Sequence, residues 1–233
     1  MFRFLLFGLL IFSTLKVQGQ LAIINDPDNF TNVRKDKSVT SKVVGRLYKD
    51  DVFLYSFDKE DDQWVGIFYT KADSSYIQGF IHKSRLLPIA ELEHISWKRK
   101  SRTEKTKELL IQNDSMQVVV KTESFISAKH KIERDKEGYV IRIDGKQPKG
   151  TDGNLPKIGL TYISVKVNGK DVFIPAGTYK DLFEPEIKSF NVYFDKKGII
   201  YLYMPFNSDG AGGYFVAWTI KNGKYSKRYV DSP

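Results

Sequence analysis

The sequence predicts an all-β protein, in which a small barrel is followed by an antiparallel β-sandwich or barrel with one short helix. Short runs rich in β-branched and aromatic residues predict the strands, and polar segments of turn composition separate these runs. Two Asn-Gly pairs, Asn168-Gly169 and Asn222-Gly223, mark hairpins. Asn-Gly is a strong hairpin signal because both central residues of a type I′ turn need positive φ.

The first predicted unit covers residues 20–90. Four of its runs have strand composition, and acidic or polar connectors join them. They are Val43–Leu47, Val52–Phe57, Gln63–Tyr69 and Gln78–Ile81. Four or five short strands within ~70 residues are typical of a small barrel.

Motifs of this unit resemble the bacterial SH3-like (SH3b) domain over about a third of the chain. They are Asn32-Val33-Arg34, the run from Lys42 to Leu47 with its acidic turn, Trp64, and the closing Gly79-Phe-Ile-His-Lys-Ser-Arg-Leu86. The resemblance implies a non-catalytic barrel of a kind common in exported bacterial proteins. Several such barrels accompany peptidoglycan hydrolases as wall-binding modules.

One turn departs from the pattern of that family. Many relatives continue the Asn-Val-Arg motif with Ser-Gly-Pro, whereas this chain has Lys35-Asp36-Lys37. Glycine admits positive φ and proline fixes φ, so we expect a different turn conformation here.

Aromatic residues are the candidate ligand contacts of the first unit, because sugars and peptides dock on flat apolar faces. The candidates are Phe30, Tyr55, Trp64 and Tyr69. We expect Asn32 and Arg34 to hold the turn and the barrel instead, since these side chains can bond backbone groups. His82 is expected at the surface or in a turn, not on a metal.

The second predicted unit covers residues 91–233 and resembles no family that we identify. Four strand pairs are expected around residues 113–115, 168–169, 196–198 and 222–223. A short helix is expected over Thr178–Phe183, after Pro175 and before Pro185.

Two loops rich in Asp, Asn and Gly offer acidic candidates, Asp152 in residues 149–156 and Asp209 in residues 207–213. Turn formation explains such loops, unless these acids converge in space with Asp181, Glu184 and Glu186. A convergent cluster would favour metal binding or a glycosidase-like carboxylate pair. The sequence has no nucleophile elbow, P-loop or zinc-protease motif and only three scattered histidines, so it predicts no catalytic residue, cofactor or metal.

The N-terminus predicts export. Residues 1–19 combine a charged start, a short apolar run and a small-residue end at Gly19, which is typical of a cleaved signal peptide. No other run predicts a membrane span. With no cysteine, the chain has neither disulfides nor a lipoprotein anchor, and we expect a periplasmic or secreted protein.

The net charge of +9 would fall to +7 after loss of Arg3 and Lys16, which favours either a solvated surface or attraction to polyanions. Nucleic acid is not an expected partner of an exported protein. The sequence therefore predicts a non-catalytic envelope protein that binds a cell-wall polymer or an envelope protein. Two alternatives stay open: an enzyme that acts on glycans or the wall through the loop acids, and an inhibitor or immunity protein against a hydrolase or toxin.

Overall fold

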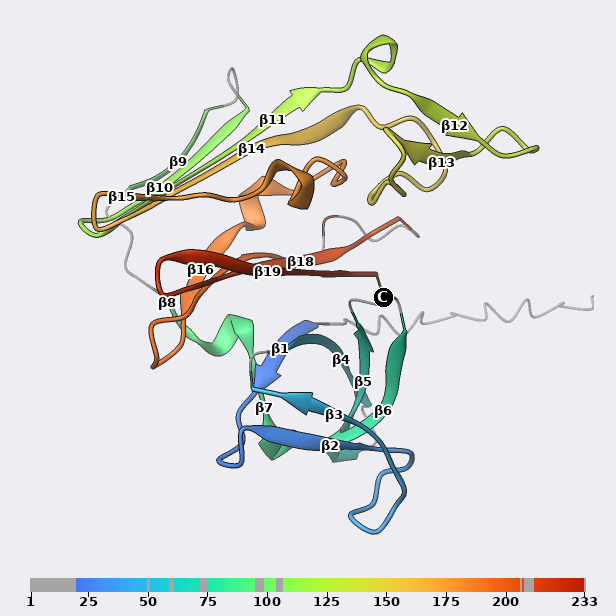
Figure 1. Cartoon of the computed structure of the whole chain (residues 1–233), viewed down its shortest axis with the longest axis vertical. Helices are drawn as coiled ribbons and strands as arrows, with labels where there is room; N and C mark the ends of the chain where they lie inside the picture. Colours follow the sequence, from blue (N-terminus) through green and yellow to red (C-terminus); the bar gives the residue numbers. More distant parts are fainter. Residues whose placement is uncertain are drawn as a thin grey trace, which may run out of the picture.

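In the part of the chain that the structure describes, the regular elements are β-strands and short 3-10 turns, and the sheets stack in three layers (Figure 1). The computed structural model describes residues 20–49, 51–58, 61–71, 75–94, 99–103, 107–205, 207 and 212–232. The predicted signal peptide and Asp209 lie outside these residues. No helix in the described part of the chain is long and apolar enough to cross a membrane.

The first layer is a strongly curled seven-stranded sheet, with strand order β3-β2-β6-β5-β4-β1-β7, and we refer to it as the barrel. Its strands are β1 (Gln20–Ile24), β2 (Phe30–Arg34), β3 (Val43–Tyr48), β4 (Val52–Asp58), β5 (Asp61–Thr70), β6 (Tyr76–His82) and β7 (Leu86–Pro88). All four strands named from the sequence are present, and β1, β2 and β7 are added to them.

Alternate residues of these strands point inward to a separate core. Members of this core include Val33, Phe53, Val65 and Ile81, all at most 1% exposed. The curl brings β2 against β6 so closely that a Cβ on Gly79 would lie 2.4 Å from the Arg34 carbonyl oxygen. Only glycine therefore fits at this position of the closing motif.

The other two layers form an antiparallel sandwich. The outer sheet has the order β15-β14-β11-β10-β9 and the central sheet has the order β19-β18-β17-β16-β8. The outer strands are β9 (Arg99–Thr103), β10 (Glu108–Gln112), β11 (Met116–Ser124), β14 (Ile158–Val167) and β15 (Lys170–Val172). The central strands are β8 (Glu93–His94), β16 (Asn191–Phe194), β17 (Ile200–Met204), β18 (Phe215–Lys221) and β19 (Lys224–Asp231). A small sheet of β12 (Ile132–Arg134) and β13 (Val140–Ile143) projects from one end.

The four predicted hairpins are confirmed as β10–β11, β14–β15, β16–β17 and β18–β19. At the two Asn-Gly turns both residues have positive φ, 49° and 76° at Asn168 and Gly169, and 52° and 69° at Asn222 and Gly223. These values are the ones that a type I′ turn requires.

The helical turn of the sandwich lies earlier in the chain than expected. A 3-10 turn covers Ala176–Thr178, and no longer helix follows it in the predicted range 178–183. The Thr178 carbonyl oxygen instead accepts hydrogen bonds from Trp218 Nε1 at 2.9 Å and Arg228 Nη1 at 3.0 Å. Leu182 bridges to Lys149, so tertiary contacts hold this segment in an irregular path.

The central sheet is buried on both faces. In β17 and β18, Leu202 and Trp218 face the sandwich core, whereas Tyr203 and Phe215 face the barrel. The barrel contributes Leu21, Ile23, Val52, Leu54 and Ile89 to the same buried cluster. A continuous apolar interface therefore joins the barrel to the sandwich.

Strand β19 ties this interface together with polar contacts at every second residue. Lys227 Nζ lies 3.2 Å from Asp51 Oδ1, and Asp231 Oδ2 accepts a hydrogen bond from Thr70 Oγ1 at 3.1 Å. Between them, the Tyr229 hydroxyl accepts from the Leu54 N–H at 3.2 Å and lies 3.2 Å from the Phe68 carbonyl oxygen. Because side chains of a strand alternate, residues 227, 229 and 231 all reach the barrel.

Strongly alkaline pH should weaken this structure. Burial raises the pKa of Tyr203 to about 12, and burial together with Asp231 raises the pKa of Tyr229 further. Since an unfolded tyrosine ionises near pH 10, these phenols stabilise the fold fully below about pH 10 and lose that contribution as the pH rises toward 12.

The measurement is the urea midpoint between pH 8 and about pH 11.5, for the wild type and for Tyr203→Phe. We expect the wild-type midpoint to fall above about pH 10 and the variant to show a shallower decline. Equal pH dependence of the two proteins would contradict the role given to Tyr203.

Candidate functional site

Part of the barrel's outer surface stays open. The central sheet covers the outer side of β1 and part of β4, where Leu21 and Leu54 are buried against it. The outer side of β5 and β6 is not covered, and four aromatic residues gather there. They are Trp64, Phe68, Tyr76 and Phe80, which we call the aromatic face.

Cross-strand pairing places these side chains in a row. Register pairs Trp64 with His82, Gly66 with Phe80, and Phe68 with Gln78. The Trp64 and His82 rings meet edge to face at 5.6 Å, and the Phe68 and Tyr76 rings stack at 5.4 Å. Such pairs stabilise a sheet, and their exposed surfaces also offer flat apolar area to a ligand.

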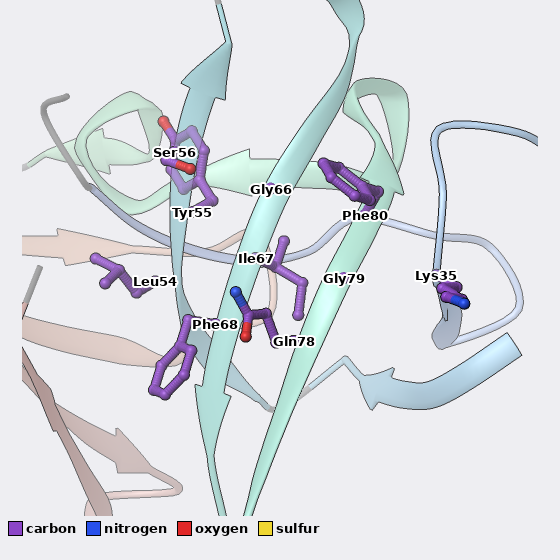
Figure 2. A pocket seen from close by; sticks show the side chains of 10 residues that line it. All are labelled: Lys35, Leu54, Tyr55, Ser56, Gly66, Ile67, Phe68, Gln78, Gly79 and Phe80. Atoms are coloured by element: carbon purple, nitrogen blue, oxygen red, sulfur yellow. The ribbon is translucent and has the colours of Figure 1, made fainter. Parts of the chain in front are cut away.

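A hollow of about 620 Å³ lies in the aromatic face at the position of Gly66 (Figure 2). Leu54 and Phe68 lie on one side of it, and Phe80 and Lys35 lie on the other. The remaining lining residues are Tyr55, Ser56, Gly66, Ile67, Gln78 and Gly79. Gly66 adds no side chain to the floor of the hollow, and the Ser56 hydroxyl lies 3.0 Å from the position that a Cβ on Gly66 would take.

A second hollow, of about 410 Å³, lies beside Trp64. Phe30, Asn32 and Arg34 line it from β2, together with Trp64 and His82. It also contains Asp26 and Arg85, which form an ion pair at 2.8 Å with the Asp26 side chain 4% exposed. The charges of this second hollow are therefore largely satisfied within the protein.

Among the residues that carry the resemblance, Arg34 and His82 bond backbone groups of turns, whereas Asn32 bonds the Arg46 side chain and not a backbone group. Arg34 Nη1 donates to the Ser41 carbonyl oxygen at 2.8 Å, and Asn32 Oδ1 accepts from Arg46 Nε at 3.0 Å. His82 caps the 3-10 turn at Lys83–Arg85, because its side chain accepts from the Ser84 N–H. These contacts shape the loops around the aromatic face.

Of the four aromatic candidates, Phe30 and Trp64 line the second hollow, whereas Tyr55 is buried and the half-buried Tyr69 packs against another residue of the protein. Tyr55 is 1% exposed, and its hydroxyl donates to Gln20 at 2.8 Å from inside the barrel. Tyr69 stacks on Tyr229 at 6.0 Å, and its hydroxyl donates to Asp51 at 2.9 Å. Tyr55 therefore packs in the core, and Tyr69 supports the interface.

The two acidic loops meet where Gly212 packs on Asp152, and the carboxylates of Asp181, Glu184 and Glu186 have other partners. A Cβ on Gly212 would lie 2.5 Å from Asp152 Oδ1, so residues 149–153 pack on the second loop. Asp181 binds Arg228 through two contacts of 2.7 and 3.0 Å. Glu184 accepts from the Lys157 and Ile158 N–H groups, and Glu186 accepts from the Lys188 N–H.

These three acids thus hold backbone and packing in place. Within the described ranges, no group of three His, Asp or Glu side chains could hold a metal ion. Asp209 lies outside those ranges. The described geometry brings together aromatic rings on the barrel, and it brings together no comparable set of carboxylates.

The candidates selected from the sequence did not include Phe68, Tyr76, Phe80 or Lys35, although the sequence contains a signal for the three aromatic residues. In Gln78–Ile81 and Gln63–Tyr69, buried Ile81 and Val65 alternate with the outward positions. Extending this period-2 pattern from Trp64 places Phe68 on its face. Nothing in the sequence indicates that Lys35 reaches the same hollow.

Comparison with protein-family models, with curated proteins and with solved structures finds no match for this chain.

Proposed function

We propose that this chain is an exported, non-catalytic binding protein whose barrel binds a cell-wall glycan on the aromatic face. The observation that carries the proposal is the row of Trp64, Phe68, Tyr76 and Phe80 on the open side of the barrel, where Phe68 and Phe80 line a hollow of about 620 Å³. Sugar rings stack on such faces through their C–H surfaces. The resemblance to SH3b domains and the predicted signal peptide favour the same ligand class.

The row geometry favours a polymer over a small molecule. The pairs Trp64–His82 and Phe68–Tyr76 lie on either side of Gly66 along the same two strands. Residues two apart on a strand are separated by about 7 Å, so the row offers successive contacts along an extended ligand. A glycan strand presents successive rings in the same way.

The test is co-sedimentation of the purified protein with insoluble peptidoglycan. Phe80→Ala should lower the bound fraction at least fivefold, because it removes a ring beside the hollow without touching the barrel core. Tyr162→Ala is the matched control, since Tyr162 is an exposed aromatic on β14 of the outer sheet, 44% exposed. Equal retention of Phe80→Ala and wild type, or no retention of wild type, would contradict the proposal.

A further inference from the structure

Gly66 leaves a gap at the centre of the aromatic face. On β5, Trp64 lies two residues before it and Phe68 lies two residues after it, so the three positions share one face of the strand. Cross-strand pairing places Ser56 of β4 on one side of Gly66 and Phe80 of β6 on the other. The gap is therefore bordered by three aromatic residues and one hydroxyl group.

The backbone does not require a glycine at this position. Gly66 lies outside the positive-φ region that favours glycine. A Cβ on Gly66 would lie 3.0 Å from the Ser56 hydroxyl and 4.0 Å from the Ser56 carbonyl oxygen, whereas at Gly79 the nearest atom is a backbone oxygen at 2.4 Å. A glycine inside a strand often marks a place where a ligand approaches the backbone closely. Because Gly66 lies on the open side of the barrel, its missing side chain leaves room for a ligand group.

Two neutral side chains beside the gap can form hydrogen bonds. The Ser56 hydroxyl points toward Gly66, as its distance of 3.0 Å from the Cβ position shows. Gln78 reaches from β6 across β5 toward Phe68, its cross-strand partner (Figure 2). Within the described part of the chain, neither Ser56 nor Gln78 has a side-chain hydrogen-bond partner. Since a hydroxyl and a primary amide each donate and accept, both can bind a neutral polar group of a ligand.

The gap and its two polar neighbours match an acetamido group. An acetamido group consists of a methyl group and a planar amide, which donates through its N–H and accepts through its carbonyl oxygen. The methyl group would fill the gap beside the Phe68 and Phe80 rings, which removes its apolar surface from water. The amide would then bond to the Ser56 hydroxyl and the Gln78 side chain. A sugar hydroxyl in the same place would leave the gap unfilled.

We infer that the aromatic face selects N-acetylated sugars, and that Gly66, Ser56 and Gln78 form the site of the acetamido group. This inference rests on the proposed function and adds the chemical class of the ligand. The sugar rings stack on the aromatic row, whereas the acetamido group distinguishes between glycans that have the same ring spacing. Specificity is therefore placed in the gap of β5 and not in the rings around it.

The test compares two soluble, uncharged probes by isothermal titration. One probe is the tetrasaccharide of N-acetylglucosamine. The other is the tetrasaccharide of glucose with the same linkage, which carries a hydroxyl in place of each acetamido group. We expect the wild type to bind the acetylated probe about tenfold more tightly, because a methyl group in an apolar site and a matched hydrogen bond both discriminate between ligands. Since neither probe is charged, this preference should be the same in low and high salt.

Gly66→Ala should abolish the preference, because its methyl group occupies the gap while the aromatic rings stay in place. Ser56→Ala removes the hydroxyl without adding bulk and should lower the preference about threefold, and it tests the same site if Gly66→Ala fails to fold. Both variants should bind the glucose probe as the wild type does. Ser164→Ala is the matched control, since Ser164 is a half-buried serine on β14 that lines neither hollow, and it should keep the full preference.

Failure of the inference and failure of the proposed function give different results. Equal affinity of the wild type for the two probes, or an unchanged preference in Ser56→Ala and in folded Gly66→Ala, would overturn the selection of N-acetylated sugars. So would a wild type that peptidoglycan retains and that binds neither probe. In each of these cases Phe80→Ala should still lower retention on peptidoglycan. If the wild type binds neither peptidoglycan nor either probe, the proposed function itself is wrong.

Discussion

Tyr229→Ala should lower the free energy of unfolding by about 3–5 kcal/mol, the range typical of removing a buried aromatic side chain. Tyr229 is 7% exposed and lies between the barrel and the sandwich. The change removes the ring that stacks on Tyr69 and the hydroxyl that accepts the Leu54 N–H. Packing and hydrogen bonding are therefore lost together.

Tyr229→Phe separates the two losses. It keeps the stacked ring and leaves the Leu54 N–H without its acceptor, so we expect a smaller cost of about 1–3 kcal/mol. Urea denaturation followed by circular dichroism measures both variants. A cost below about 1 kcal/mol for Tyr229→Ala would show that the interface contributes little to stability.

The hairpins of this fold could be predicted because their signals are local. Positive φ at Asn168-Gly169 and Asn222-Gly223 depends on the two residues themselves. The sandwich followed from these hairpins, since each has at least one apolar face to bury. The path of residues 178–183 depends on Trp218 and Arg228, which are distant in sequence, and local patterns predicted a helix in the wrong place there.

The interface between the barrel and the sandwich was not predicted, although the strands that form it differ in sequence from strands with one exposed face. The runs Ile199–Met204 and Tyr214–Ile220 contain almost no polar residue, which is typical of strands buried on both faces. A continuous apolar run also explains why the burial of Tyr55 was not predicted. Val52, Phe53, Leu54 and Tyr55 are all apolar or aromatic, so no alternation indicates which side chains face the barrel core. Leu54 faces the sandwich and Tyr55 faces the barrel core.

The sequence predicted that aromatic residues of the barrel form the candidate site, but it identified only some of these residues. Choosing candidates only because they are aromatic gave Phe30 and Trp64, which line the second hollow. It also gave Tyr69, whose ring stacks on Tyr229 within the protein. Distinguishing them requires knowing which half of the barrel the central sheet covers. This coverage depends on tertiary contacts with the central sheet, so the spacing of residues within 20–90 cannot predict it.

Dividing the chain at residue 90 should therefore disrupt both parts. The cut falls between Ile89 and Leu92, which are 0% and 7% exposed and belong to the interface cluster. Residues 91–233 would expose Tyr201, Tyr203 and Phe215 on one continuous face of the central sheet. An exposed apolar face of this kind favours association and aggregation.

We expect residues 91–233 expressed alone to elute as aggregates in size-exclusion chromatography and to bind a hydrophobic dye. Co-expression with residues 20–90 is the control, because the two fragments should re-form the interface and elute together. Two monomeric fragments that each unfold cooperatively at the midpoint of the intact chain would contradict this. Since the central sheet is a shared layer, the aromatic face belongs to one fused structure, and its binding is best measured in the intact protein.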